Sequence, residues 1–462
     1  MFAAIRNWFW KFMLKRLKHV VRETKYGGQV IVLNTGAVIG PEEEAMLQAL
    51  HSRSVGGLFD HLTILAKKGA KKFMASFYVG YGHKSIGDCG TATIFIEGVS
   101  MLVAKAIQDW PLYSGQEAST RYIDFANQRF IDIVGNFWSR SVHEAWRDAY
   151  VRYLPVMVKH FKKRFPFQDG WDRADYEKAI KARAFDVVRG LLPAGASTNL
   201  AWHTNLRQAA DHIEWLRHHL LDEVRDVAEK MEDALREAFP SSFTLKRYDA
   251  TESYHAVWMR HNYYGDATIH PDFAFNADGI DWKLTESILP AMHNRPPKTE
   301  LPKEVAFCGT VRFEFLLCFG SFRDIQRHRA VTQRMPLLTT NFGFEQWYID
   351  EMPREIRSEV LKLIEYQRDA VERLNLSPEE AQYFHPMGYR TPNALVGDLR
   401  ALVYLVELRS TRSVHPTLRR RARQMAEVLM DEFGKYELAL HLDDDPEAFD
   451  VKRGKHDIVM KK

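Results

Sequence analysis

Stretches of strand-like and helix-like hydrophobic pattern alternate along the chain. Residues 29–34 form a β-branched run that ends in Thr35-Gly36, the pattern of a strand followed by a turn. Pro41 and the three glutamates after it predict the start of a helix, because proline fits the first turn and acids stabilise its positive dipole end. Residues 91–96 again read as a strand. The chain therefore mixes both kinds of element from its beginning.

Helical patterns dominate the remainder. Residues 142–165, 220–239 and 353–374 show the spacing of amphipathic or charge-laced helices. Two apolar runs, residues 99–107 and 313–325, each precede a polar stretch, and we predict the second of them to be a buried helix. The Arg419-Arg420-Arg421 run lies on the last helical pattern and is expected to be a solvated or subunit-contact face.

The second half of the chain repeats landmarks of the first half. Four residues recur in register at one constant offset: Pro193, Gly195, Thr198 and Arg207 correspond to Pro386, Gly388, Thr391 and Arg400. Proline and glycine hold specific backbone roles, so their joint recurrence predicts an internal duplication. The predicted organisation is a basic arm (1–22), a first repeat (23–240), a linker (241–265), a second repeat (266–450) and a basic tail (451–462).

The first 22 residues differ from the rest in composition. Aromatic and aliphatic residues alternate there with lysine and arginine, and no acid precedes Glu23. Such a basic amphipathic helix could lie on an anionic membrane surface or act as a targeting segment. Docking on the body of the protein gives the same pattern, and both interpretations stay open.

Length and charge set broad limits. A chain of 462 residues suffices for two or three domains, and a net charge of +4 gives no reason to expect a nucleic-acid partner. The three cysteines, Cys89, Cys308 and Cys318, have neither metal nor disulfide spacing, so we expect no metal site and a reducing, cytoplasmic location. No apolar run reaches the ~20 residues that span a membrane, and neither a dinucleotide fingerprint nor a Walker sequence occurs.

Hydroxyl, amide, carboxylate and guanidinium groups are concentrated in Ser114-Gly115-Gln116-Glu117-Ala118-Ser119-Thr120-Arg121-Tyr122. Arg121 can fork onto phosphate oxygens, and Ser119 and Thr120 can add short hydrogen bonds. Glu117 can accept from a sugar hydroxyl or a ring N–H. The stretch suits an anion with a hydroxylated, planar body, although a polar loop with a structural arginine would look the same.

This stretch and a second passage, Arg327-His328-Arg329, together resemble the signature of the flavin-dependent thymidylate synthases. That signature reads Arg-His-Arg, two residues, Ser, one residue, Asn or Gln, Glu, one residue, Ser, one residue, Arg-Tyr. In the first repeat the tail matches at Ser114, Gln116, Glu117, Ser119, Arg121 and Tyr122, but Asp109-Trp110-Pro111 replaces the head. In the second repeat the head matches, and the tail has changed to Thr332, Arg334, Met335, Leu337 and Thr339. Each repeat keeps what the other lost, so we expect the two half-signatures to converge on one site.

Further positions extend the resemblance. Gly82-His83-Lys84-Ser85 matches a family segment, with Asp88-Cys89 as a departure from the Glu-His that follows it, and Arg409 keeps a spacing that Arg217 misses by one residue. By resemblance, the substrate-binding residues are Gln116, Glu117, Ser119, Arg121 and Arg189. The cofactor-binding residues are His83, Ser85, Asn205, Arg207, Arg327, His328 and Arg329, and the catalytic residue is Arg409.

The resemblance implies an α+β fold, with two tandem domains that each place helices around a small, mostly antiparallel sheet. It implies reductive C5 methylation of dUMP to dTMP, with FAD as cofactor and NADPH and methylenetetrahydrofolate as co-substrates. Because the family's sites form between subunits of a tetramer, a tandem chain would act as a homodimer that forms a pseudo-tetramer. Two alternatives stay open: C5 methylation or hydroxymethylation of another pyrimidine nucleotide, and a non-catalytic flavin- or nucleotide-binding protein of the same fold.

Overall fold

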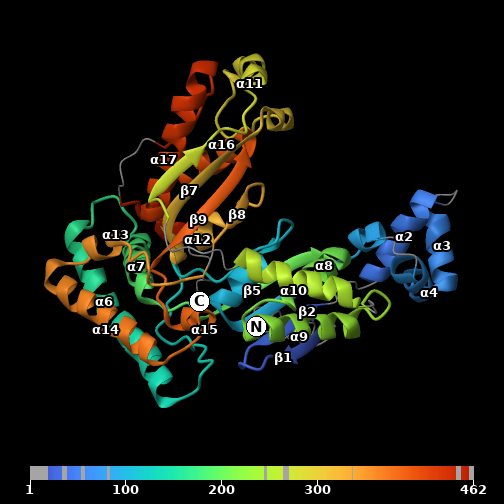
Figure 1. Cartoon of the computed structure of the whole chain (residues 1–462), viewed down its shortest axis with the longest axis horizontal. Coiled ribbons are helices and arrows are strands. Elements are labelled where there is room, and N and C mark those ends of the chain that lie inside the picture. Colours follow the sequence, from blue (N-terminus) through green and yellow to red (C-terminus); the bar gives the residue numbers. More distant parts are fainter. Residues whose placement is uncertain are drawn as a thin grey trace. The chain divides into compact units, whose positions relative to one another are not determined.

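Two antiparallel sheets organise the chain, one in each of two units of the computed structural model (Figure 1). The first unit comprises residues 1–118 and 197–261, and the second comprises residues 119–196 and 262–462. The structure describes residues 19–33, 39–53, 58–80, 84–243, 247–263, 270–335, 337–443 and 449–456. Residues 1–18 of the predicted arm and 457–462 of the predicted tail lie outside this set.

The sheet of the first unit has the order β1-β2-β3-β5-β4. Its strands are β1 (His19–Glu23), β2 (Gln29–Leu33), β3 (Thr91–Ser100), β4 (Ser114–Glu117) and β5 (Ser197–Asn205). Neighbouring strands are antiparallel, and Ile94 of β3 lies opposite Trp202 of β5, both fully buried. The strands predicted at residues 29–34 and 91–96 are confirmed.

Helices cover this sheet. After β3 the chain turns directly into α5 (Met101–Gln108), where Ser100 Oγ accepts a hydrogen bond from the Val103 amide at 3.2 Å as the helix cap. Helix α9 (Asp222–Ala238) packs on β1 and β2. The other helical segments are α2 (Pro41–Arg53), α3 (Leu58–Lys68), α4 (Lys71–Phe73), η1 (Met74–Gly80), η2 (Lys84–Cys89), α8 (Leu206–Leu216) and α10 (Asp249–Tyr263). Helix α10 occupies much of the predicted linker.

The second unit holds a sheet of order β6-β7-β9-β8. Its strands are β6 (Phe273–Asn276), β7 (Thr310–Cys318), β8 (Thr332–Arg334) and β9 (Arg390–Asp398). The helix predicted over residues 313–325 is wrong in its first half, since Phe313 pairs with Leu395 of β9 and only α12 (Phe319–Ile325) is helical. The residues from Leu316 to Cys318 are all buried, and a strand that buries both faces shows the same continuous apolar run as a buried helix.

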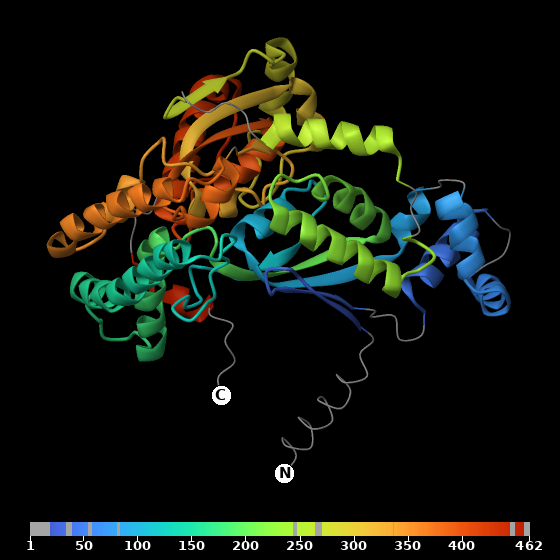
Figure 2. The ribbon, with the colours of Figure 1, turned by 60° about the horizontal axis from the view of Figure 1, so that its bottom comes forward.

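Long helices complete the second unit. Helix α6 (Phe137–Arg164) packs against α14 (Arg354–Arg373) and α7 (Arg173–Val188), as Figure 2 shows. Helix α16 (Leu399–Arg409) packs against α17 (Pro416–Phe433), which also contacts β7. The shorter segments are η3 (Arg189–Leu191), α11 (Trp282–Ile288), η4 (Leu289–Met292), η5 (Lys303–Cys308), α13 (Gln346–Asp350), α15 (Pro378–Ala381), η6 (Gln382–Phe384), η7 (Gly434–Tyr436) and η8 (Val451–His456).

The two sheets repeat one plan, which supports the duplication. The order β2-β3-β5-β4 in one sheet corresponds to β6-β7-β9-β8 in the other. The α+β class with mostly antiparallel sheets is thereby confirmed. The compact units nevertheless differ from the repeats predicted from sequence, because residues 119–196 of the first repeat belong to the second unit.

Within the second unit, equivalent loops of the two repeats pair with each other around Pro193 and Pro386. The Met387 amide donates to the Leu192 carbonyl at 2.8 Å, and the Ala194 amide donates to the His385 carbonyl at 2.9 Å. These two bonds interchange when equivalent positions of the repeats are exchanged. The junction thus has the reciprocal pattern of a two-fold contact inside one chain.

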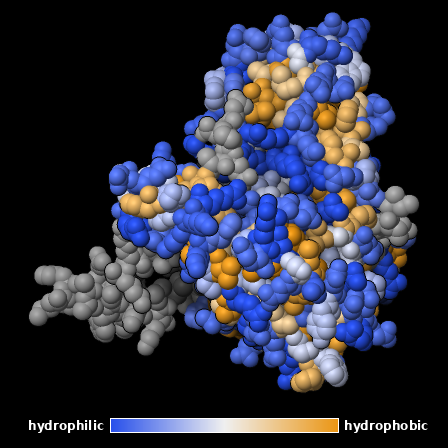
Figure 3. Space-filling model, turned by 90° about the vertical axis from the view of Figure 1, so that its left-hand side faces the viewer, coloured by the Kyte–Doolittle hydropathy of each residue, from blue (hydrophilic) through white to orange (hydrophobic). Residues whose placement is uncertain are grey.

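No helix in the described part of the chain is both long enough and apolar enough to cross a bilayer. On the face drawn in Figure 3, hydrophobic residues form separate patches among hydrophilic ones.

The Pro193–Pro386 junction provides a stability test. A Cβ added at Gly195 would lie 2.5 Å from the Tyr383 carbonyl oxygen and 3.1 Å from that of Ile131, both backbone atoms. We therefore expect Gly195→Ala to lower the free energy of unfolding by about 1–3 kcal/mol through overpacking. Denaturant titration measures the change.

Gly434→Ala is the matched control. Its Cβ would meet only the terminal methyl of Met430 at 3.5 Å, an ordinary contact, and Gly434 has helical dihedral angles. This substitution should be neutral or stabilising by under about 1 kcal/mol. An equal loss of unfolding free energy in Gly195→Ala and Gly434→Ala would contradict tight packing at the junction.

Candidate anion-binding site

Thr120 lies between two buried arginines of the second unit. The Nη1 atoms of Arg189, in η3, and of Arg323, in α12, each donate to Thr120 Oγ1 over a long 3.5 Å. Arg189 is only 2% exposed, and its Nε and Nη2 have no hydrogen-bond partner among the described residues. A buried guanidinium with free donors is costly unless an anion completes it, so this position is suited to binding one.

The Arg327-His328-Arg329 segment follows α12 and meets the end of α16. Arg409 Nε donates to His328 Nε2 at 2.7 Å, and Arg409 Nη2 donates to the Asp324 carbonyl at 2.7 Å. Burial lowers the pKa of His328 to about 3, and the nearby Arg409 and Arg329 act in the same direction. His328 is therefore neutral at physiological pH, as an acceptor at Nε2 requires. Burial also lowers the pKa of Arg409, which Asp324 opposes.

The Asp324 carboxylate lies among arginines from both half-signatures. Burial acts to raise the pKa of Asp324, but the surrounding guanidinium groups outweigh burial and lower it. Four arginines contribute in decreasing order: Arg189, Arg121, Arg409 and Arg327. Asp324 Oδ2 is buried without a hydrogen-bond partner among the described residues. The second unit thus brings Arg121 of the first half-signature near Arg327 of the second, whereas Ser114, Gln116 and Glu117 belong to the first unit.

A second carboxylate, Asp186 of α7, is fully buried and is shared by two arginines. Arg121 contacts it through Nε at 2.7 Å and Nη2 at 3.3 Å, and Arg453 through Nη1 at 2.5 Å and Nη2 at 3.0 Å. Burial would raise the pKa of Asp186, but Arg121 and Arg453 outweigh burial and hold it well below its usual range. Burial would also lower the pKa of Arg121, and Asp186 reverses that and raises it. Both partners are therefore charged at neutral pH.

We refer to seven residues as the arginine cluster: Arg121, Arg189, Arg323, Arg327, Arg329, Arg409 and Arg453. Only two carboxylates, Asp186 and Asp324, are among the partners described above. The excess of positive charge and the free donors of Arg189 favour a dianionic group such as phosphate.

The equivalent position in the second repeat lacks this chemistry. Gln382 stands there in place of Arg189, and its Oε1 accepts from the Leu338 amide at 3.0 Å. Leu338, the counterpart of Thr120, is fully buried. An apolar side chain and an amide have thus replaced the hydroxyl and the guanidinium, so the second unit contains this arrangement once.

Three of the remaining predicted residues of the first unit already have internal partners. Glu117 accepts from Gln108 at 2.7 Å, and Asn205 caps α8 by accepting from the Gln208 amide at 2.8 Å. Arg207 pairs with Asp88 at 2.7 Å. Gln116 lies on β4 and Ser85 in η2, while His83 lies outside the described residues. In the second unit, Ser119 Oγ accepts from the Arg121 amide at 3.3 Å.

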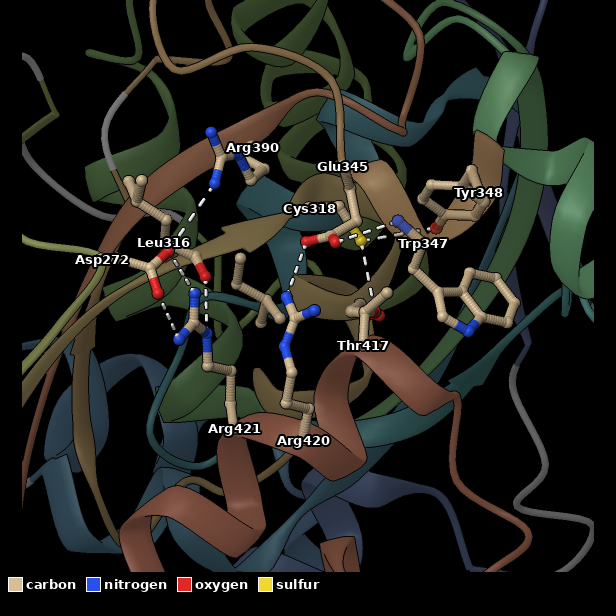
Figure 4. Close-up of polar contacts among 12 residues, drawn as sticks. Asp272, Leu316, Cys318, Glu345, Trp347, Tyr348, Arg390, Thr417, Arg420 and Arg421 are labelled. Atoms are coloured by element: carbon tan, nitrogen blue, oxygen red, sulfur yellow. Dashed lines mark hydrogen bonds and ion pairs between the residues drawn. The ribbon is translucent and has the colours of Figure 1, made fainter. Parts of the chain in front are cut away.

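The expectation of a solvated face for the Arg419-Arg420-Arg421 run is wrong for two of its members. Arg421 is 1% exposed, and Figure 4 shows it directed at Asp272 and the Leu316 carbonyl. Its Nε donates to that carbonyl at 2.9 Å, and its Nη2 pairs with Asp272 at 2.7 Å. Arg419, also buried, donates to the Ser410 carbonyl at 2.6 Å. Only Arg420, half exposed and paired with Glu345 at 3.0 Å, resembles the expected surface arginine.

Asp186, Arg323, Asp324 and Arg453 were not predicted from the sequence. Asp186 precedes Arg189 by three residues, and this one-turn helical spacing was an available signal. Arg323 and Asp324 are separated from the Arg-His-Arg segment by two residues, Ile325 and Gln326. Nothing local marks Arg453, which pairs with Asp186 across 267 positions of sequence.

Comparison with known proteins addresses the same region. Residues 40–241 match the model of a family described as thymidylate synthase complementing protein, which is the flavin-dependent thymidylate synthase family. The match covers most of the first repeat, including the signature tail and Arg189.

Three relatives extend beyond the matched residues. UPF0159 proteins of Chlamydia pneumoniae and Chlamydia muridarum are 26% and 27% identical, covering 88% and 75% of this chain and 87% and 76% of their own lengths. A UPF0159 protein of Thermoplasma acidophilum is 26% identical over 76% of this chain and 85% of its own. Alignments of this extent exceed one repeat, so the similarity includes parts of both.

Asp186 provides the test of the site's electrostatics. We expect Asp186→Asn to destabilise the protein by about 3–5 kcal/mol, because two buried guanidinium groups lose their partner. Since the folded-state pKa is depressed, the carboxylate's contribution is fully present above its unfolded pKa of ~4 and is lost as pH falls below that value. Denaturant titrations between pH 7 and pH 3 should show a shallower acid limb in the variant.

Asp233→Asn is the control, because Asp233 is half exposed and pairs with Arg22 at the surface. Its loss should cost under about 1 kcal/mol. If Asp186→Asn costs no more stability than Asp233→Asn, the two ion pairs of Asp186 are not buried as described.

Proposed function

We propose that the chain is a flavin-dependent thymidylate synthase-like enzyme that catalyses the reductive C5 methylation of dUMP to dTMP. The observation that carries this proposal is the arginine cluster, which draws Arg121 and Arg189 from the first repeat and Arg327 and Arg409 from the second. Neither repeat contains all four groups. The family match over residues 40–241 supports the choice of reaction.

The substrate phosphate is assigned to Arg189 and Arg121. Arg189 offers Nε and Nη2, and among the described residues none accepts a hydrogen bond from Arg121 Nη1. Asp186 holds the other edge of the Arg121 guanidinium, which fixes the orientation of the free donor. Charge-assisted bonds of this kind are about twice as strong as neutral ones.

Arg409 is assigned to the uracil ring. His328 and the Asp324 carbonyl fix its guanidinium, and in the described part of the chain its Nη1 has no acceptor. A positive charge held against a uracil carbonyl oxygen stabilises the enolate that forms when C5 reacts, so no cysteine nucleophile is required. Loss of one such donor costs on the order of 3 kcal/mol of transition-state stabilisation.

The residues present fit a flavin cofactor through the chemistry of its phosphates. Within the cluster, Arg327 is exposed and Arg329 is half-buried. These residues, with His328 holding Arg409, would bind FAD phosphates. When bound, reduced FAD supplies hydride, methylenetetrahydrofolate supplies the carbon, and NADPH reduces the flavin. The protein binds and orients these ligands and polarises the uracil ring.

We also infer a homodimer, in which four repeats rebuild the family's tetramer. The reciprocal bonding at the Pro193–Pro386 junction supports this inference, since it is the kind of contact that relates identical subunits elsewhere.

The test is tritium release from C5-labelled dUMP by protein reconstituted with FAD, NADPH and methylenetetrahydrofolate. Arg409→Gln should reduce kcat about 100- to 1000-fold, because its guanidinium acts on the developing charge. Arg189→Ala should chiefly raise KM, because it removes phosphate contacts. Both effects follow from the separate roles assigned above.

Arg312→Gln is the control: Arg312 lies on β7, more than half exposed and paired with Glu314. It should leave kcat and KM unchanged. Reconstituted protein that binds dUMP without releasing tritium would contradict the proposal and favour a non-catalytic nucleotide-binding protein. If only another pyrimidine nucleotide is turned over, that nucleotide and not dUMP is the substrate.

A further inference from the structure

The C-terminal segment lies against the arginine cluster. Segment η8 contacts α7, and Phe449 just before it stacks on Phe165 at 5.1 Å between ring centroids. The guanidinium of Arg453 lies 5.2 Å from the centroid of the Tyr122 ring. Tyr122 belongs to the signature tail, so a segment distant in sequence contacts the proposed nucleotide site.

Arg453 and Arg121 share one carboxylate. Each uses two nitrogens on the two oxygens of Asp186, and together those contacts occupy the ~4 lone-pair sites that a carboxylate offers. Two guanidinium groups and one carboxylate leave one positive charge in a buried setting. Asp324 supplies a second negative charge near Arg121, but Arg189, Arg409 and Arg327 share it, so a further anion would stabilise the buried charge.

The C-terminal segment fills space instead of lining an open pocket. The cleft bounded by Arg121, Asp186, Phe449 and Arg453 has a volume of about 40 Å³. By this measure ~10–15 Å³ holds one water molecule, so the cleft has room for only a few. The Arg453 guanidinium is already paired with Asp186 through Nη1 and Nη2, so its effect on a ligand runs through Asp186 and Arg121.

We propose that Arg453 is a positioning residue for the nucleotide site, and that it raises phosphate affinity by sharing Asp186 with Arg121. This inference rests on the proposed function for the identity of the ligand. With Arg453 present, Asp186 neutralises Arg121 only in part, and Arg121 keeps charge for the ligand. Without it, Asp186 pairs with Arg121 alone. By linkage, a phosphate bound at Arg121 and Arg189 also strengthens the docking of the C-terminal segment.

The test measures binding of inorganic phosphate and of dUMP to the full chain by calorimetry. Arg453→Ala should weaken both by about tenfold, within the usual range of coupling between sites, while kcat at saturating dUMP stays within about twofold. Arg453→Lys should recover part of the affinity, because lysine restores charge without the two-pronged geometry.

Lys452→Ala is the matched control, since it removes the same charge from an exposed neighbour. Its affinity should equal that of the unaltered chain. Equal weakening in both variants would indicate general electrostatics and overturn the proposal, as would an unchanged affinity in Arg453→Ala.

A second measurement addresses docking directly. Phosphate should slow tryptic cleavage after Lys452 and Arg453 several-fold. An equal cleavage rate with and without phosphate would contradict the linkage. If phosphate binds in an Arg453-dependent manner but dUMP is not turned over, this inference stands and the proposed function fails. If dUMP is turned over and Arg453→Ala binds normally, only this inference fails. If no anion binds, both fail.

Discussion

The backbone junction at Pro193 and Pro386 is the constraint on which the candidate site depends. Four hydrogen bonds join equivalent loops there, two of them from the amides of Gly195 and Gly388. The junction holds Arg189, which directly precedes its first loop, in the same unit as the second repeat. The buried carboxylates then decide how the assembled guanidinium groups are oriented.

Much of the fold could be predicted from the sequence, because its signals are local. Strand β2, helix α2 and the long helices α6, α9 and α14 follow from periodicity, caps and β-branched runs. The end of strand β7 could not be distinguished from a helix, since Leu316–Cys318 are all buried and lose the alternation that residues 310–315 keep. The register of the repeats came from proline and glycine, whose backbone roles persist when side chains diverge.

The candidate site was predictable only in part. Arg121, Arg189 and Arg409 were found through spacing, whereas their partners Asp186, Asp324 and Arg453 were missed. A carboxylate that balances a buried arginine has no fixed sequence distance from it, as the separation of Arg453 from Asp186 shows. The same reason explains the error over Arg421, which charge patterning assigned to the surface although the Leu316 carbonyl and Asp272 hold it inside.

Neutral His328 has a consequence for how the site responds to its surroundings. Its ring stays unprotonated until pH approaches about 3. The hydrogen bond that it accepts from Arg409 therefore persists across the pH range in which most proteins operate. Histidine often responds to mild acidity, but His328 stays neutral in that range and only holds Arg409 in place. Any sensitivity of ligand capture between pH 5 and pH 8 would then originate in the ligand, whose phosphate changes charge near pH ~6.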